Sequence, residues 1–383
     1  MPEEHRPALA PAKGPLERLP EEWADTLTGW GEPAYRAAQV FKWIHQRGVF
    51  DAAQMTDLPK RLRARLAEEE GLAPALEIAS EHLSEDGTRK LLLRMHDGRT
   101  VESVLIPQGS SGAEDPIGGE EPEDESRPVT QCISSQVGCA MACVFCASGM
   151  AGLKRNMTAG EIVSQVLIGR SKVQEGHRLR NVVLMGMGEP LHNYDEVARA
   201  LVLLFHPEGI GLGTRRVTLS TSGLVPQMDR LGRDFGGKVQ LAVSLHVPDD
   251  ERRSALMPIN KKHPLAELVE AMRRYPLPPR RRITIEYTLV RGYNDELSDA
   301  KRLAALLGGL RVKVNLIPMN PIADNPLGPP SWEVVEAFHD RLWDAGIPTF
   351  VRRKKGDDIA AACGQLALAG ESKKVRVPLP VTR

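Results

Sequence analysis

The chain has 383 residues, of which 42% are hydrophobic and 26% charged, and its 50 basic side chains balance its 50 acidic ones. No apolar run approaches the roughly eighteen residues that a membrane-spanning helix needs, so we expect no membrane association and a chain that can bury a sizeable core. The N-terminal segment has no apolar stretch of the kind found in secretory signals, and five cysteines are too few for a secreted disulfide framework, which together predict a cytoplasmic location.

Short β-branched segments alternate with helical ones from about residue 130. Thr158 and Glu161 have the spacing of a capping box at the start of the first helix. Repeated strand–helix units predict a parallel sheet, and six units suit an open (β/α)6 barrel whose ligands bind at the carboxyl ends of the strands. The expected strands are 129–137, 181–185, 216–220, 238–244, 282–290, 311–317 and a seventh candidate at 348–353, and the expected helices are 158–174, 194–205, 225–231, 265–274, 296–307 and 331–345.

Three of the five cysteines, Cys139, Cys143 and Cys146, form a CxxxCxxC pattern with Phe145 just before the last thiol. Structural zinc would need a fourth ligand, and no second CxxC or HxxxH pair lies nearby. Inert buried cysteines would suit a core strand, whereas the flanking Gly138 suits a ligand loop. The pattern therefore predicts a [4Fe–4S] cluster held by three thiolates, with one iron left open for chemistry.

Polar and glycine residues follow the successive expected strands. Glycines before a helix are ordinary turn residues, but they also let the backbone approach a ligand closely, and Glu189 can accept a hydrogen bond from an amino group. Serine and asparagine are common caps, and His246 alone would be read as a core histidine. Because parallel strands end at one edge of their sheet, we expect all these residues to converge on one ligand site. They are Gly186, Gly188, Glu189, Ser220, Ser244, Leu245, His246 and Asn320.

The other two cysteines, Cys132 and Cys363, are far apart in the sequence. A lone cysteine is usually a small hydrophobic residue, and Cys132 lies on an expected strand. Cys363, however, follows a stretch rich in Gly, Asp and Lys, where a thiol can be exposed and its thiolate stabilised by a basic neighbour. Cys363 is therefore a candidate nucleophile.

The cysteine pattern resembles the signature of radical S-adenosylmethionine (SAM) enzymes, and the whole chain resembles the RlmN family of adenine-C2 RNA methyltransferases. The Cfr enzymes, which methylate adenine C8, are near relatives of that family. The small N-terminal helical domain of the family has its counterpart in YRAAQVFKWIHQRG at 35–48 and DLPK at 57–60. The other resembling motifs are CISSQVGC at 132–139, GMGEPL at 186–191, VTLSTSG at 217–223, SLH at 244–246, PINKK at 258–262, NLIP at 315–318 and GDDIAAACGQL at 356–366.

The resemblance implies an α/β fold in four parts. They are a helical, RNA-binding accessory domain at 1–75, a short β linker at 76–128, a partial (β/α)6 radical SAM barrel at 129–370 with a C-terminal catalytic-cysteine loop, and a tail at 371–383. The linker contains an acidic, Gly-rich loop at 108–128 that is longer than the usual connection in the family. Its composition predicts disorder, and beside an RNA site it would repel phosphate unless it swings away.

The resemblance also implies a role for each candidate residue. Cys363 would carry the methyl group of one SAM as S-methylcysteine, and a second SAM would give the 5′-deoxyadenosyl radical that activates it. Cys132 would then release the product by forming a disulfide with Cys363. Glu102 matches the family's proton acceptor, although either Glu102 or Cys132 could remove the C2 proton. Cys139, Cys143 and Cys146 would hold the cluster, and Gly188, Glu189, Ser220, Ser244, Leu245, His246 and Asn320 would surround SAM.

The implied substrates are an adenosine in large-subunit 23S rRNA and one in the tRNA anticodon loop, each turned out of its stack. A flavodoxin-like electron donor is implied, and we expect a monomer. Basic runs at 261–262, 280–282 and 352–355 are usually solvated faces, but around one active-site mouth they would form an RNA footprint. Two alternatives stay open: a Cfr-like C8 methyltransferase, and a non-catalytic RNA-binding factor with an Fe–S cluster, which would need neither Cys132 nor Cys363.

Overall fold

One ten-stranded sheet organises the chain in the computed structural model, which describes residues 7–108, 126–322, 325–352 and 355–366. Its strands, in spatial order, are β1 (Leu76–Leu83), β2 (Arg89–Met95), β3 (Thr100–Pro107), β4 (Arg127–Cys132), β7 (His177–Leu184), β8 (Val217–Thr221), β9 (Gln240–Ser244), β10 (Ile283–Leu289), β11 (Val312–Pro318) and β12 (Thr349–Val351). Strands β1 to β4 pair antiparallel and β4 to β12 pair parallel. The seven parallel strands confirm the expected alternation, including the seventh candidate.

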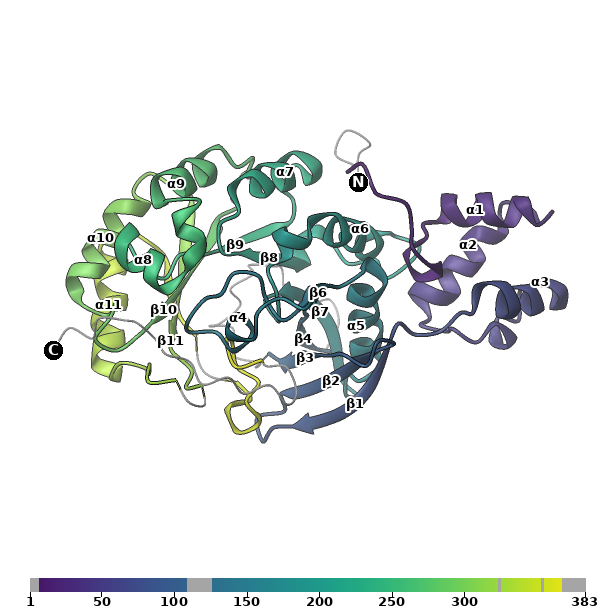
Figure 1. Cartoon of the computed structure of the whole chain (residues 1–383), viewed down its shortest axis with the longest axis horizontal. Coiled ribbons are helices and arrows are strands. Elements are labelled where there is room, and N and C mark those ends of the chain that lie inside the picture. The colour runs from purple at the N-terminus through teal and green to yellow at the C-terminus, as the bar shows by residue number, and fades with distance from the viewer. Residues whose placement is uncertain (1–6, 109–125, 323–324, 353–354, 367–383) are drawn as a thin grey trace.

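Helices lie between the parallel strands, and most of them cover the outer face of the curved sheet (Figure 1). They are α4 (Ala147–Ala151), α5 (Ala159–Ser171), α6 (Tyr194–Phe205), α7 (Val225–Phe235), α8 (Asp250–Leu256), α9 (Leu265–Arg274), α10 (Leu297–Leu307) and α11 (Trp332–Asp344). Helices α6 and α9 have the predicted bounds. The capping box of α5 is confirmed, because Thr158 Oγ1 accepts from the Glu161 N–H (3.2 Å) and the Glu161 carboxylate accepts from the Thr158 N–H (2.9 Å). None of these helices in the described part of the chain has the length and apolar character to cross a membrane.

The strand predicted at 129–137 is wrong in its second half. Strand β4 ends at Cys132, and β5 (Gln136–Val137) pairs instead with β6 (Arg155–Asn156) in a separate two-stranded sheet. The chain leaves the large sheet because the N–H groups of Ser135 and Gln136 donate to the Met187 carbonyl (2.8 and 3.2 Å). This detour carries the cysteine loop across the carboxyl ends of the parallel strands.

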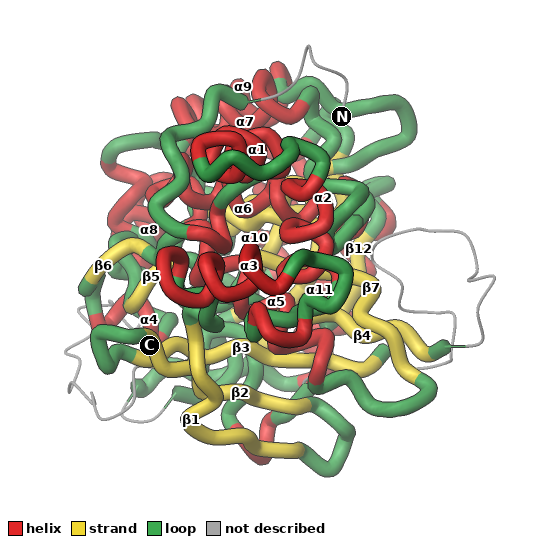
Figure 2. The backbone as a smooth tube through the Cα atoms, turned by 90° about the vertical axis from the view of Figure 1, so that its right-hand side faces the viewer, coloured by secondary structure: helices red, strands yellow, loops and turns green. Residues whose placement is uncertain are grey.

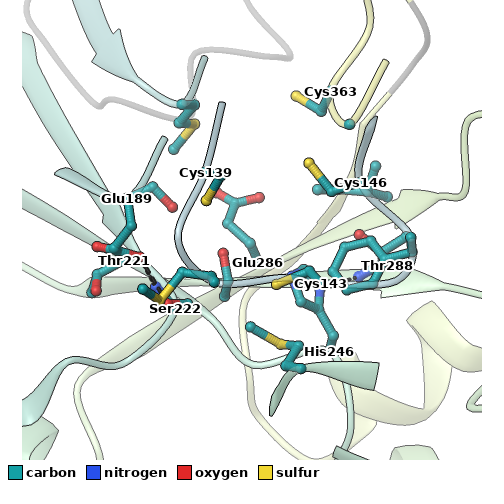
Figure 3. A pocket seen from close by; sticks show the side chains of 18 of the residues that line it. Cys139, Cys143, Cys146, Glu189, Thr221, Ser222, His246, Glu286, Thr288 and Cys363 are labelled. Atoms are coloured by element: carbon teal, nitrogen blue, oxygen red, sulfur yellow. Dashed lines mark hydrogen bonds between the residues drawn. The ribbon is translucent and has the colours of Figure 1, made fainter. Parts of the chain in front are cut away.

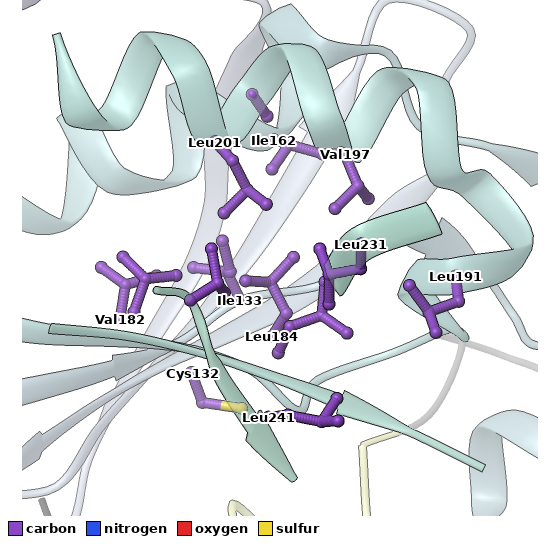
Figure 4. Packing of buried hydrophobic residues seen from close by; sticks show 14 of the residues in the cluster. Cys132, Ile133, Ile162, Val182, Leu184, Leu191, Val197, Leu201, Leu231 and Leu241 are labelled. Carbon is purple, nitrogen blue, oxygen red and sulfur yellow. The ribbon is translucent and has the colours of Figure 1, made fainter. Parts of the chain in front are cut away.

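The core beneath α5 and α6 is apolar and fixes the strands that carry the site (Figure 4). Ile162 on α5 and Val197 and Leu201 on α6 pack above Val182 and Leu184 on β7. Each of the five side chains is at most 2% exposed. Burial of this many branched side chains, each worth about 1.5–3 kcal/mol, makes β7 a rigid base for the glycine loop that follows it.

The N-terminal helices α1 (Pro20–Gly29), α2 (Arg36–Phe41) and α3 (Lys60–Arg65) form a small bundle beside the barrel, seen face-on in Figure 2. A buried arginine on α6 ties the bundle to the barrel. Arg199 donates to both carboxylate oxygens of Glu22 (2.9 and 3.0 Å) and to the Glu17 carbonyl (2.8 Å). The bundle is thus anchored by a charge-assisted bidentate contact.

The β linker predicted at 76–128 extends the barrel sheet. Strand β3 pairs antiparallel with β4, with Val104 opposite Cys132. The Gln108 N–H donates to the Pro128 carbonyl (2.9 Å), so the acidic loop leaves and re-enters the sheet at adjacent points. Residues 109–125 of that loop and the tail at 371–383 lie outside the described residues, and the division into four parts stays a prediction.

Candidate active site

Two adjoining cavities lie at and below the carboxyl ends of the parallel strands. The first, the rim cavity, has a volume of about 170 Å³ and lies under the cysteine loop (Figure 3). The second, the thiol cavity, has a volume of about 180 Å³ and contains Cys132 and Cys363 in its walls. Strands β4 and β7 form one side of it and β11 and β12 the other, which places it inside the curled sheet. Cys363, Glu286 and Asn320 line both cavities.

The predicted cluster ligands lie together on the rim cavity. Cys139 and Cys143 are buried and Cys146 is half-buried. The loop that carries them needs glycine at its base, because a Cβ on Gly138 would lie 1.9 Å from the Gly152 carbonyl oxygen. Gly138 also has a φ of +77°, which glycine adopts without strain. The sequence therefore folds the three thiols over the strand ends rather than into a core strand.

Burial sets the electrostatics of these thiols. It raises the pKa of Cys139 to about 12 and that of Cys143 well above its ordinary value, and neighbouring thiols add to both shifts. A bound cationic centre reverses this effect, because a coordinating thiol is deprotonated outright. Without a bound metal, these buried thiols are therefore mostly protonated at neutral pH.

The arrangement fits an iron–sulfur cluster better than zinc. Within the part of the chain that the structure describes, no three His, Cys, Asp or Glu side chains close around a single ion. A tetrahedral zinc site would bring its thiolates within about 2.3 Å of one metal. A four-iron cluster spans more widely spaced thiolates, and the three cysteines line one cavity large enough for a group of several atoms.

The Gly188–Glu189 segment brings backbone and a carboxylate to the rim cavity. A Cβ on Gly188, whose φ is +106°, would lie 2.6 Å from the Gln136 Cβ, so only glycine fits. Glu189 accepts from the Ser222 N–H (2.7 Å), the Ser222 Oγ–H (2.8 Å) and the Leu191 N–H (3.1 Å). Burial raises the pKa of Glu189, while the hydrogen bonds from Ser222 oppose that rise.

His246 presents a neutral imidazole to the same cavity. Its Nδ1 accepts from the Thr288 N–H (2.9 Å), so the neutral ring carries its proton on Nε2. Burial lowers the pKa of His246 to about 3, which keeps the ring neutral. Phe145 packs edge-on against it, with ring centroids 4.8 Å apart. His246 is therefore a fixed N–H donor, not a core histidine.

The structure brings most of the predicted SAM residues to the rim cavity. Ser220, Ser244 and Asn320 line it, together with Gly186, Gly188, Glu189 and His246. Leu245 does not line either cavity; its side chain is fully buried and its carbonyl oxygen accepts from Arg253 (3.0 Å). Its role stays a prediction.

Arg253 is a central residue that sequence reasoning missed. It lies on α8, which was not predicted, and its buried guanidinium donates to the carbonyls of Ser222 (2.9 Å) and Ser244 (3.0 Å) and to Asn260 Oδ1 (2.7 Å). Burial lowers its pKa to about 10, so it stays charged at neutral pH. The available signal was Asp249, whose side chain caps α8 by accepting from the Arg252 N–H (2.9 Å).

Cys132 and Cys363 meet across the thiol cavity, and both are free thiols. A basic neighbour, Arg352, favours the Cys363 thiolate as expected, but burial and the charge of Glu286 outweigh it. Residue 363 is exposed overall, but its thiol is crowded by cavity walls, and this burial followed by the charge of Glu286 raises its pKa while Arg352 lowers it. Burial and the proximity of Cys363 also raise the pKa of Cys132.

Glu102 lies near this region but not in the walls of either cavity. It sits on β3, is buried, and pairs with Lys90 Nζ (3.1 Å). Lys90 Nζ also donates to the Ala360 carbonyl (3.2 Å) in the loop that carries Cys363. The Lys90 side chain thus links the Glu102 carboxylate to the loop that carries Cys363.

Comparison with known proteins identifies the family of the chain. The model of the radical SAM superfamily matches residues 133–304, and that of the ribosomal RNA large subunit methyltransferase N-terminal domain matches residues 20–71. A relative from Sorangium cellulosum, named dual-specificity RNA methyltransferase RlmN, is 59% identical over 379 residues, which cover 94% of this chain and 97% of the relative. The chain belongs to the RlmN family. A relative of the same name from Geobacter sulfurreducens is 50% identical, with coverage of 89% and 88%.

A solved structure extends the likeness to the RlmN fold. The crystal structure of a radical SAM methyltransferase from Sphaerobacter thermophilus superposes with a TM-score of 0.83 at 45% identity, over 93% of this chain and 99% of that chain. The mixed α/β radical SAM fold and the family resemblance are therefore confirmed. Membership of the RlmN family favours neither the Cfr-like alternative nor the non-catalytic one.

Proposed function

We propose that this RlmN family member is a radical SAM methyltransferase that methylates C2 of an adenosine in 23S rRNA and in the tRNA anticodon loop. The observation that carries the proposal is the placement of two thiols. Cys132 and Cys363 line one cavity, and Cys363 also lines the adjoining rim cavity. One thiol can thus serve a cofactor on one side and an RNA base on the other.

The rim cavity is the proposed cofactor site. When bound, a [4Fe–4S] cluster and two SAM molecules per turnover supply a transferable methyl group and a hydrogen-abstracting radical. The Nε2–H of His246 and the carboxylate of Glu189 offer a donor and an acceptor, which suit the polar groups of an amino-acid-bearing ligand. Cys139, Cys143 and Cys146 would hold the cluster, and Gly188, Glu189, Ser220, Ser244, His246 and Asn320, which line the rim cavity, would surround SAM. Leu245 is proposed to take part through its backbone, since its side chain lines neither cavity.

Two thiols are needed because adenine C2 is an electron-poor carbon that cannot attack a methyl donor directly. The Cys363 thiol loses its proton and takes the methyl group as S-methylcysteine. After one hydrogen atom is removed from that group, its carbon bonds to C2, the C2 proton is lost, and the unpaired electron of the adduct would pass to the bound cluster. The Cys132 thiolate then attacks the Cys363 sulfur, which breaks the bond between that sulfur and the transferred carbon, leaves a Cys132–Cys363 disulfide, and lets the released carbon take a proton to become the methyl group. The disulfide must be reduced before the next turnover.

Glu102 is the proposed acceptor of the C2 proton. Support comes from its link through Lys90 to the Ala360 carbonyl, which couples the position of the carboxylate to the Cys363 loop. A buried carboxylate that already pairs with one ammonium group can hold a proton when that pair separates.

The proposed partners are folded RNAs and a flavodoxin-like electron donor, and the protein acts as a cytoplasmic monomer. Of the basic runs, Arg352 and Lys355 line the thiol cavity and are exposed, which suits phosphates flanking a nucleotide whose base enters it. Lys261 and Lys262 line neither cavity, nor do residues 280–282.

The test is mass spectrometry of nucleosides from rRNA and tRNA after anaerobic incubation with reconstituted protein, SAM and a low-potential reductant. We expect 2-methyladenosine in both RNAs. Appearance of 8-methyladenosine instead would contradict the C2 assignment and favour the Cfr-like alternative. Absence of methylation despite an intact cluster and SAM cleavage would point to another substrate or to the RNA-binding factor.

A further inference from the structure

The thiol cavity contains buried amide oxygens that no described residue satisfies. Asn181 on β7 and Asn315 on β11 line it and are only 4% and 5% exposed. Among residues 7–108, 126–322, 325–352 and 355–366, neither side-chain Oδ1 has a hydrogen-bond donor. A buried acceptor left unpaired is destabilising, so each of these oxygens points to a ligand or to water that supplies an N–H or O–H.

The orientation of the Asn315 amide is set by its neighbour. Its Nδ2 donates to Glu286 Oε1 (3.0 Å), which leaves the carbonyl oxygen as the group available to a ligand. Glu286 lines both cavities, and its charge acts on the Cys363 thiol. Asn315 therefore presents an acceptor beside a carboxylate whose charge acts on the Cys363 thiol. Asn181 instead donates its Nδ2 to Thr130 Oγ1 (3.4 Å), two residues before Cys132 on β4.

The cavity suits a nucleobase in size and charge. Its volume of about 180 Å³ is more than ten times the roughly 10–15 Å³ that one buried water needs. Exposed Arg352 and Lys355 in its walls can meet phosphate, while the other walls are apolar side chains, the two thiols, and neutral amides and hydroxyls, apart from Glu286 and Lys313. The exposed cations would meet the phosphates of a flipped nucleotide, and the amides inside the cavity would meet its base.

We propose that the thiol cavity receives the target base and that the Asn315 Oδ1 accepts a hydrogen bond from its exocyclic amino group, which makes Asn315 a specificity-determining residue. This inference rests on the proposed function. In adenine, the reactive C2 and the carbon that bears the 6-amino group flank the same ring nitrogen, so an acceptor for that amino group must lie near Cys363. A guanine or hypoxanthine would place a carbonyl oxygen against Asn315, and two facing acceptors repel each other.

The test compares three RNA stem-loops that differ only at the target nucleotide: adenosine, purine riboside without the amino group, and inosine. Dissociation constants are measured with anaerobically reconstituted protein in the absence of reductant, so that no turnover occurs. The wild-type protein should bind the adenosine RNA about two- to tenfold more tightly than the purine riboside RNA, which is the range of one neutral hydrogen bond, and bind the inosine RNA most weakly.

The Asn315→Leu variant keeps the size of the side chain and removes its acceptor. It should bind the adenosine and purine riboside RNAs within about twofold of each other, below the range of one hydrogen bond. Asn181→Leu is the matched control, because it removes an equally buried acceptor from the same cavity, and it should retain the wild-type preference. Loss of the preference in Asn181→Leu but not in Asn315→Leu would overturn the assignment to Asn315.

Equal binding of all three RNAs by the wild-type protein would mean that water alone satisfies the amide, and would overturn the inference without the need for any variant. Product analysis separates this failure from that of the proposed function. If the adenosine RNA yields 2-methyladenosine while the affinities are equal, only the inference fails. If no RNA is methylated, the proposed function itself fails.

Discussion

The rim of the site and the loop that carries Cys363 are held in different ways. The rim residues follow strands whose side chains are almost fully buried, such as Leu241 and Val243 at 1% and 0% exposure. The loop at 356–366 buries Ala361, Ala362 and Leu366 and is otherwise held by single polar contacts, among them Asn320 Nδ2 to the Cys363 carbonyl (3.0 Å) and Ser148 Oγ to the Leu366 carbonyl (2.7 Å). Each such polar contact is worth about 1 kcal/mol. We therefore expect the loop to move more readily than the rim.

The strongest test of the rim is removal of a cluster ligand. In Cys143→Ala only two thiols of the triplet remain, so iron bound after anaerobic reconstitution should fall to background, and RNA methylation should become undetectable. Cys363→Ala is the matched control, since it should also abolish methylation but keep the wild-type iron content and cluster absorbance. A Cys143→Ala protein with full iron content would contradict the ligand assignment.

Arg253 tests whether the rim behaves as part of the core. Arg253→Ala removes the guanidinium that donates to the carbonyls of Leu245, Ser222 and Ser244, and should lower the free energy of unfolding by about 3–5 kcal/mol, as measured by urea denaturation. Arg273→Ala on α9 is the control, because Arg273 is exposed and its removal should cost less than about 0.5 kcal/mol. Equal destabilisation by the two substitutions would contradict the structural role of Arg253.

The loop should respond locally instead. The Asp358 carboxylate accepts from Ser84 Oγ (2.5 Å) and from the Glu85 N–H (3.3 Å), which ties the loop to the turn after β1. In Asp358→Ala, amide hydrogen exchange across 356–364 should be about tenfold faster, with a change in global stability below about 1 kcal/mol. Ser84→Ala should give a similar effect, and the double substitution should add little to either. A loss of global stability as large as that of Arg253→Ala would show that the loop is part of the core.

Sequence patterns predicted the elements and residues whose chemistry is local. Helices α6 and α9 have strong helical periodicity, and their bounds were predicted correctly. The cysteine spacing also predicted correctly that three thiols share one cavity. All three lie within eight residues, so their proximity can be predicted without knowledge of the tertiary fold. The end of β4 was missed because Ser135 and Gln136 leave the sheet for the Met187 carbonyl, a partner more than fifty residues away.

The thiol cavity shows what local patterns could not reveal. Thr284, Glu286 and Thr288 alternate along β10 and point into the two cavities. This period of two was a usable signal, because a buried parallel strand is normally apolar on both faces. The convergence of Asn181 and Asn315, in contrast, depends on the curl of the sheet that brings β7 and β11 to one cavity. No spacing in the sequence encodes that curl.

The smallest predicted effect concerns the charge around Cys363. Burial and then Glu286 raise the pKa of this thiol, so Glu286→Gln should lower that pKa and speed alkylation by iodoacetamide about two- to tenfold, since one pKa unit is tenfold in thiolate. Burial raises the pKa of Glu286 itself. The difference between variant and wild type should therefore vanish at low pH, where Glu286 is neutral, and again above the pKa of Cys363, where both thiols are ionised. Peptide mass spectrometry of Cys363 across this range measures both limits.

Arg352→Gln provides the opposite control for that experiment. Arg352 lowers the pKa of Cys363, so its removal should slow alkylation at the same pH. Glu286→Gln removes a negative charge and Arg352→Gln removes a positive one. If the first speeds alkylation of Cys363 and the second slows it, the effect is electrostatic. If both substitutions accelerated alkylation, the loop would instead have loosened, because greater exposure of the thiol is the one change that both variants share. A slower alkylation of Cys363 in Arg352→Gln would thus show that neighbouring charges set the reactivity of the thiol. A faster one would show that the loop has moved and exposed it.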